Sequence, residues 1–189
     1  MVADDVHVVK TIIANYAQIK EVINKVIEIK DKLIDLCLEG NITEDEFYRV
    51  SSLLTPQSRS PLWEKYFIKK HDALRVSANK NAGDLVLNKK YYEYKSSYND
   101  SGSVNIVQVR LWQPCDYIIE VIQIDEKNVT VTTFVLTHDQ MEKEMESAGP
   151  AHGTAEANEN NENVELRISF DIGDEYWEKW IYKYTNKLN

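Results

Sequence analysis

Residues 83–97 constrain the fold of this 189-residue chain more than any other segment. The sequence alternates like a strand up to Asn88-Lys89, where it can turn, and then alternates again. Because strand side chains point to one face at every second residue, Glu93 and Lys95 share a face. A tight hairpin would also bring Asp84 beside them, so we expect two carboxylates and one ammonium group to meet at one place.

Such a cluster is energetically costly unless a divalent cation binds there, and it suits metal-assisted hydrolysis of a phosphodiester. An acid-x-Lys triplet alone is weak evidence, because Glu28-Ile29-Lys30 and Asp125-Glu126-Lys127 also occur. The first falls in a predicted helix, where residues i and i+2 do not face each other, and the second in a predicted turn. Only Glu93-Tyr94-Lys95 has a hairpin context. The alternative is a surface hairpin with an ordinary Glu–Lys pair.

The rest of the sequence predicts an α/β protein with an N-terminal helical arm. Apolar residues recur every three or four positions through residues 5–39, Gly40-Asn41 ends that helix, and Thr43-Glu44-Asp45-Glu46 is a capping box. The further elements expected are a helix at 60–71, the hairpin, a helix at 104–113, strands at 116–124 and 129–136, a helix after Thr137, a strand at 164–170 and a helix at 174–186.

Together these elements predict a mixed central sheet flanked by helices. We expect residues 1–57 to form a helical region packed on a core of residues 58–189, with a mobile loop near 148–163. The apolar stripe from Val9 to Cys37 is longer than one small sheet needs. Part of it should therefore face a protein partner, although a simple hairpin of the first two helices on the core is the alternative.

The net charge of −9 argues at first against a nucleic-acid partner, but its distribution does not. Residues 60–113 hold nine Lys and Arg against five acidic residues, which makes this segment +4 and leaves −13 for the remainder. No apolar run is long enough for a membrane span, and the acidic N-terminus lacks a secretory signal. The two cysteines, Cys37 and Cys115, are far apart and are expected to be idle thiols in a reducing cytoplasm.

Gly83-Asp84 followed by Glu93-Tyr94-Lys95 resembles the motif of the PD-(D/E)XK nuclease superfamily, with glycine in place of the usual proline. Segments resembling type II restriction endonucleases are Ser60-Pro61-Leu62-Trp63-Glu64, Asn105-Ile106-Val107-Gln108-Val109-Arg110-Leu111-Trp112-Gln113 and Ala151-His152-Gly153-Thr154. With its small size, helical arm and acidic charge, the chain most resembles the small catalytic subunit of a heterodimeric type IIS restriction endonuclease. The resemblance covers about residues 60–155.

This resemblance implies a restriction-endonuclease-like core and a type II site-specific deoxyribonuclease in the bacterial cytoplasm. The chain would be a cleavage subunit that nicks one strand of double-stranded DNA, while a larger partner recognises the site and cuts the other. Asp84, Glu93 and the carbonyl of Tyr94 would hold Mg²⁺, which Mn²⁺ can replace. Lys95 would orient or deprotonate the attacking water and counter charge in the transition state.

The resemblance also implies site residues outside the hairpin. Glu64, on the preceding helix, would add an acid to the metal cluster, and Gln108, on the predicted helix after the site, would position water or phosphate. The expected DNA contacts are Lys89, Ser96, Ser97, Arg110 and His152. Purely structural roles are the alternatives for these residues: solvated charges, a buried amide, strand-end serines and a loop histidine.

Two other functions stay open at this stage. One is a stand-alone DNA repair or junction nuclease of the same superfamily, for which we would expect a more basic surface. The other is a non-catalytic helical adaptor with a merely structural hairpin, which would bind no Mg²⁺ or Mn²⁺ through Glu93.

Overall fold

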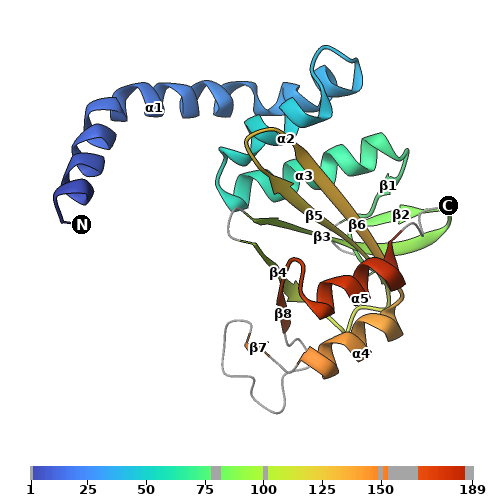
Figure 1. The fold of residues 1–189 in the computed structure, drawn as a ribbon. Coiled ribbons are helices and arrows are strands. Elements are labelled where there is room, and N and C mark those ends of the chain that lie inside the picture. Colours follow the sequence, from blue (N-terminus) through green and yellow to red (C-terminus); the bar gives the residue numbers. More distant parts are fainter. Residues whose placement is uncertain (1, 78–81, 100–101, 149–150, 153–165, 186–189) are drawn as a thin grey trace. The chain divides into compact units, whose positions relative to one another are not determined.

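The computed structural model describes residues 2–77, 82–99, 102–148, 151–152 and 166–185. Within them the chain is an α/β protein with a mixed central sheet, as predicted, and it has five α-helices (Figure 1). It divides into two compact units, Met1–Leu62 and Trp63–Asn189. The observed boundary, after Leu62, lies inside a helix and comes later in the chain than the predicted boundary after residue 57.

The first unit contains the predicted helical arm. Helix α1 (Val2–Leu38) is followed by a turn at Gly40, whose φ of +77° is in the left-handed region that glycine adopts readily. Thr43 then opens α2 (Glu44–Ser52) with the predicted capping box. The Thr43 hydroxyl accepts from the backbone N–H of Glu46, and the Glu46 carboxylate accepts from that of Thr43. Helix α1 packs on α2, and Leu33 and Ile34 are among its buried residues.

The central sheet of the second unit has the order β1-β2-β3-β5-β6. Its strands are β1 (Leu74–Arg75), β2 (Leu85–Leu87), β3 (Lys90–Asn99), β5 (Asp116–Ile124) and β6 (Val129–Leu136). Among the strands that the structure describes, only β3 and β5 pair in parallel, so the sheet is mixed. The predicted hairpin is confirmed. Asn88 and Lys89 both have positive φ, 51° and 67°, as a two-residue turn that matches the strand twist requires.

The helix predicted at 104–113 is wrong. This segment is strand β4 (Ser103–Val109), followed by a turn before Cys115, and β4 pairs with β8 (Leu166–Asp171), which pairs with β7 (Ala151–His152). A bulge between Ile106 and Val109 shifts the register, and both side chains are buried. The bulge therefore places apolar side chains inward at a spacing of three, which imitates one turn of a helix.

Helix α3 (Pro56–Lys70) also begins earlier than predicted. Its first residue is Pro56, so residues 56–59, which precede the predicted start at residue 60, are also helical. On the sheet face next to this helix, the Phe67 and Tyr94 ring centroids are 5.4 Å apart. The Trp63 and Tyr98 centroids are 6.1 Å apart, so α3 is fixed to β3 by two aromatic contacts.

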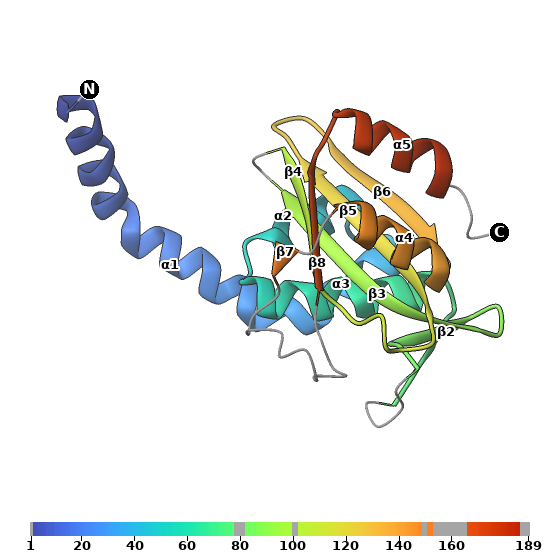
Figure 2. The ribbon, with the colours of Figure 1, turned by 90° about the horizontal axis from the view of Figure 1, so that it is seen from below.

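The opposite sheet face carries a hydrophobic core. Helices α4 (His138–Ala148) and α5 (Glu175–Tyr184) and the β4–β8 pair cover it (Figure 2). Tyr117, Ile119 and Val121 of β5 face this core, together with Trp177 and Trp180 of α5. The parallel register sets Glu93 beside Tyr117 and Lys95 beside Ile119. The two polar residues of the predicted site thus lie on the core-facing side of β3.

Most of the predicted mobile loop, 149–150 and 153–163, lies outside the described residues. The strand predicted at 164–170 is β8, and the helix predicted at 174–186 is α5, which Asp174 caps by accepting from the N–H of Trp177. None of the helices in the described ranges combines the length and apolar character needed to cross a bilayer.

Candidate active site

A close backbone approach at the start of β2 places Asp84. Gly83 has φ +89°, and a Cβ atom there would lie 2.5 Å from the carbonyl oxygen of Tyr92. The next residue is held to β3 because the N–H of Asp84 donates to that same carbonyl at 2.8 Å. Proline, with φ fixed near −65°, cannot adopt this conformation, so glycine in place of the motif's usual proline has a local geometric reason.

Asp84, Glu93 and Lys95 lie together, as the hairpin pattern predicted. The Lys95 ammonium is 2.7 Å from Oε1 of Glu93, and the pair is well buried, with side-chain exposures of 14% and 4%. Asp84 Oδ2 accepts from the backbone N–H of Tyr94 at 3.0 Å. Burial first, and then repulsion from Glu93, raises the pKa of Asp84.

Glu64 joins this group from α3. Its side chain is only 18% exposed, and Arg75 of β1 lies 3.8 Å from its Oε1. Burial raises the pKa of Glu64 to about 7, with a further contribution from the negative charge of Asp84 that Arg75 opposes. Three carboxyl groups thus repel one another here, and two of them have raised pKa values because little solvent screens them.

These groups share a cavity of about 500 Å³. Its polar lining residues are Glu64, Arg75, Ser77, Asp84, Glu93, Arg110 and Gln113. Arg110 is half-buried and belongs to the turn after β4, where its carbonyl accepts from the Tyr117 hydroxyl and the Gln113 N–H. The cavity therefore combines carboxylates with two guanidinium groups, a mixture that can receive a cation and a phosphate together.

The sequence singled out the wrong glutamine. Gln108, placed by prediction on a helix, sits in the β4 bulge with φ 56° and is exposed, and it does not line this cavity. Gln113 lines it instead. The side chain of Gln113 is 7% exposed, and its Oε1 atom has no hydrogen-bond partner. Gln113 belongs to the segment 105–113 that resembles restriction endonucleases. The bulge gives this strand a helix-like spacing of apolar residues, and the helix predicted from that spacing favoured Gln108 instead.

The predicted DNA contacts are scattered. Arg110 lies in the cavity, whereas Lys89 is exposed at the hairpin turn. Ser97 is buried, and its hydroxyl accepts from the N–H of Asn105 in β4, which favours the structural role over phosphate binding. Ser96 points to the opposite face of β3 from Glu93, because strand side chains alternate. The side chain of His152 lies outside the described part of the structure.

The chemistry of the cavity fits a hard divalent cation, although its described carboxylates are not grouped closely enough to form a complete metal site. Among the described residues, no three His, Cys, Asp or Glu side chains form a group that could hold a metal ion. Every candidate ligand is nevertheless an oxygen, and one buried amide oxygen lacks a donor. A cation would compete with Lys95 for Glu93 and with a proton for Glu64. Binding of the cation by the Tyr94 carbonyl remains a prediction.

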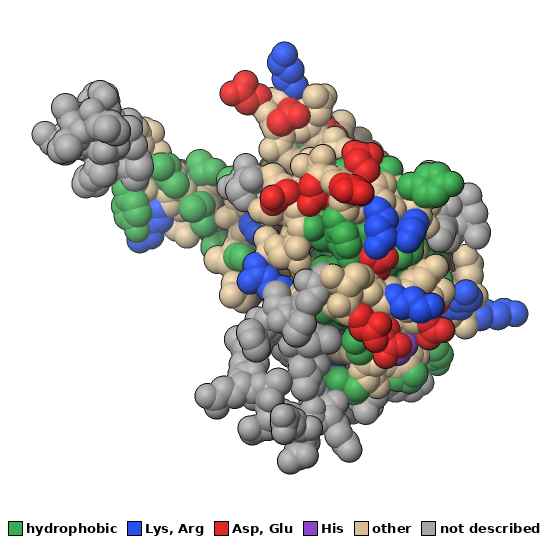
Figure 3. Space-filling model, turned by 60° about the horizontal axis from the view of Figure 1, so that its bottom comes forward, with side chains coloured by type: hydrophobic (Ala, Val, Ile, Leu, Met, Phe, Trp, Pro, Cys, Tyr) green, Lys and Arg blue, Asp and Glu red, His purple; other side chains and the backbone are tan. Residues whose placement is uncertain are grey.

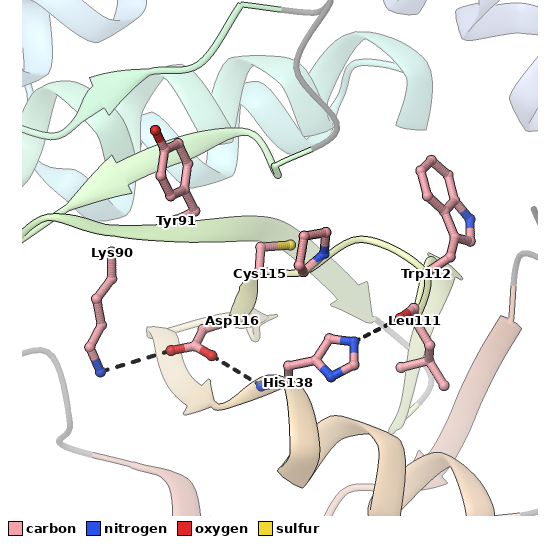
Figure 4. Close-up of a pocket in the computed structure, with 8 residues that line it drawn as sticks. Lys90, Tyr91, Leu111, Trp112, Cys115, Asp116 and His138 are labelled. Carbon is pink, nitrogen blue, oxygen red and sulfur yellow. Dashed lines mark hydrogen bonds and ion pairs between the residues drawn. The ribbon is translucent and has the colours of Figure 1, made fainter.

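A second cavity, of about 570 Å³, lies near the beginnings of β3 and β5 (Figure 4). Its polar groups are paired with each other: His138 Nε2 is 2.7 Å from the Leu111 carbonyl, and Asp116 accepts from the His138 N–H. Burial raises the pKa of Cys115 to about 12, so this thiol stays protonated and is a poor nucleophile. Asp116 is the one carboxylate among the described lining residues of this cavity, which therefore lacks the carboxylate cluster of the cavity that contains Asp84 and Glu93.

Charges of both signs are interspersed on the face of the molecule that Figure 3 shows. Such a surface gives little long-range attraction for DNA. Comparison with known proteins gave no match to a family model or to a curated sequence.

Proposed function

We propose that the chain is a Mg²⁺-dependent DNA endonuclease with a restriction-endonuclease-like core, and that it hydrolyses one phosphodiester at the cavity lined by Asp84 and Glu93, beside Lys95. The observation that carries the proposal is the buried contact of Lys95 with Glu93, beside the carboxyl group of Asp84. An isolated structural Glu–Lys pair needs no second and third acid. The proximity of Glu64 and Asp84 raises the electrostatic cost, which a bound divalent cation would offset.

The roles follow from the positions of the groups. Asp84 and Glu93, with Glu64, would hold the cation, which when bound would neutralise charge and lower the pKa of a water molecule. Lys95 would hold or accept a proton at its Nζ atom and stabilise negative charge on the phosphate. Arg75 and Arg110, which line the same cavity, would bind the non-reacting phosphate oxygens through their guanidinium groups.

We further propose that a larger DNA-recognition subunit completes the enzyme, which would act in the bacterial cytoplasm. The acidic charge outside residues 60–113 would weaken DNA binding by the chain alone. Tyr16, Ile19 and Val22 of α1 have exposures of 61%, 46% and 51%. A run of exposed apolar side chains on one helix supports a protein contact at this arm. A stand-alone repair nuclease would need neither feature.

The test is cleavage of supercoiled plasmid by the chain produced together with the products of its neighbouring genes. We expect cutting of both strands in Mg²⁺ by the wild-type pair. Asp84→Ala, Glu93→Ala and Lys95→Ala should each lower the rate of cleavage of this chain's strand by about 10²-fold or more, because such residues act as a unit. The product would then be a nicked circle.

Glu126→Ala and Lys127→Ala are the matched controls. They belong to the exposed Asp125-Glu126-Lys127 triplet in the β5–β6 turn and should leave cleavage unchanged. Circular dichroism would establish that every variant is folded. Full cleavage of both strands by folded Glu93→Ala protein would remove the active-site assignment.

A further inference from the structure

The unpaired amide oxygen of Gln113 calls for an explanation. Gln113 is only 7% exposed, and its Oε1 atom accepts no hydrogen bond. Most buried polar atoms in proteins have a hydrogen-bond partner. Leaving a buried acceptor unsatisfied costs about 1–3 kcal/mol. The backbone of Gln113 does not satisfy this oxygen. Its N–H donates to the Arg110 carbonyl, and its carbonyl accepts from the Cys115 N–H, as in an ordinary turn.

The surroundings of Gln113 narrow the choice of missing partner. Gln113 lines the cavity that also contains Glu64, Asp84 and Glu93. Two arginines, Arg75 and Arg110, line it as well, but neither donates to Gln113 Oε1. All three acidic neighbours are acceptors when ionised, so none of them can satisfy another acceptor in that state. The Lys95 ammonium, the nearest cation to Glu93, is already engaged with that carboxylate at 2.7 Å. A donor that entered this cavity with a divalent cation would satisfy both the amide and the carboxylates.

We infer that Gln113 is a positioning residue whose Oε1 atom accepts a hydrogen bond from a water molecule in the hydration shell of a divalent cation bound at Asp84 and Glu93. Mg²⁺ keeps several of its waters in proteins, and each such water is a strong donor. A group that orients bound water in this way typically changes metal affinity 10- to 100-fold, as outer-shell partners of metal ligands do. The inference rests on the proposed function, because it assumes the same cation.

The experiment is a titration of the metal-free chain with Mn²⁺, in which the electron paramagnetic resonance signal of free Mn²⁺ gives the bound fraction. Gln113→Leu removes the amide and keeps a similar volume. We expect Mn²⁺ affinity to fall about tenfold or more, while the stability of the metal-free protein in urea stays equal or rises. A merely structural amide would give the opposite: lower stability and unchanged affinity for Mn²⁺.

Two further variants sharpen the comparison. Gln113→Glu keeps an acceptor oxygen and should retain Mn²⁺ binding, which separates the acceptor from the shape of the side chain. Gln108→Leu, at the exposed glutamine in the bulge, should change nothing. If Gln113→Leu does not fold, Gln113→Met, which is unbranched and of similar length, takes its place with the same expectation.

The outcomes distinguish this inference from the proposed function. Wild-type binding that Glu93→Ala abolishes and Gln113→Leu leaves unchanged would overturn the role of Gln113 and retain the cation site. Absence of Mn²⁺ binding by the wild-type chain would overturn both. Weakened binding by Gln113→Leu together with retained binding by Gln113→Glu would establish the inference.

Discussion

Lys95 Nζ lies 2.7 Å from Glu93 Oε1, and the two residues are separated by one position on β3. The alternation of the strand sets both side chains on one face, and the hairpin sets Asp84 beside them. Lys95 therefore contacts the carboxylate oxygen of Glu93 to which a bound cation would be expected to coordinate. We interpret the pair as a charge-compensated state in which the ammonium partly offsets the carboxylates.

Glu64→Gln should stabilise the metal-free protein at high pH. The folded-state pKa of Glu64 is about 7, above its ordinary value of 4.5, so its ionisation destabilises the fold as pH rises from 4.5 to 7. Below 4.5 the group is protonated in both states and has no effect. After allowance for solvent screening, we expect a gain of about 1–2 kcal/mol in the free energy of unfolding at pH 8.5.

Urea unfolding at pH 5 and pH 8.5 measures this difference, which should be much smaller at the lower pH. Mg²⁺ should narrow the gap at pH 8.5, since it would favour the ionised wild-type carboxylate. A Glu64→Gln protein less stable than wild type at pH 8.5 would show that the carboxylate is a stabilising partner of Arg75 instead.

Glu144→Gln should destabilise the fold at neutral pH. Burial alone would raise the pKa of Glu144, but hydrogen bonds from Tyr176, Tyr184 and Lys179 outweigh burial and leave the pKa below its ordinary value. The ionised carboxylate thus joins α4 to α5. Its loss should lower the free energy of unfolding at pH 7 by about 2–4 kcal/mol, as breaking a buried, hydrogen-bonded charge does.

The pH dependence of this effect has a definite sign. A depressed folded-state pKa gives stability that is present above pH 4.5 and is lost as pH falls through the folded value. The gap between Glu144→Gln and wild type should therefore shrink in strongly acidic urea titrations. Glu146→Gln, an exposed position on the same helix, is the control and should be neutral.

Ile19→Glu combined with Ile23→Glu should spare folding but abolish cleavage of this chain's strand in the presence of the larger subunit. Ile19 is 46% exposed and Ile23 is half-buried, so two carboxylates there remain largely solvated. A plasmid-nicking assay, with circular dichroism for folding, measures both effects. Lys32→Glu, exposed on the same helix, is the charge control. Unfolding of the double variant would mean that this stripe belongs to the core.

Local sequence patterns were sufficient for the hairpin and for the start of α2. The Asn88-Lys89 turn and the alternation around it specify which side chains meet, and the Thr43 capping box specifies where α2 begins. These features depend on residues close together in the chain. The convergence of Asp84, Glu93 and Lys95 was predictable for that reason.

The cavity beyond the hairpin was less predictable, because it depends on tertiary packing. The bulge between Ile106 and Val109 imitates helical spacing, and the sequence alone gives no sign that β4 pairs with β8, about sixty residues later in the chain. The misassigned helix gave Gln108 a role and hid Gln113. Arg75 was likewise missed, since a two-residue strand that pairs with β2 brings it to Glu64.

The most direct test of the metal site is isothermal titration calorimetry of the metal-free chain with Mg²⁺, and in parallel with Mn²⁺. We predict a binding heat for the wild-type protein that disappears in Glu93→Ala and Asp84→Ala and persists in Glu126→Ala, with all four proteins folded. The prediction depends on carboxylate oxygens as the ligands of a hard cation. A wild-type protein without binding heat, or a Glu93→Ala protein with the wild-type heat, would contradict the account and favour a non-catalytic adaptor.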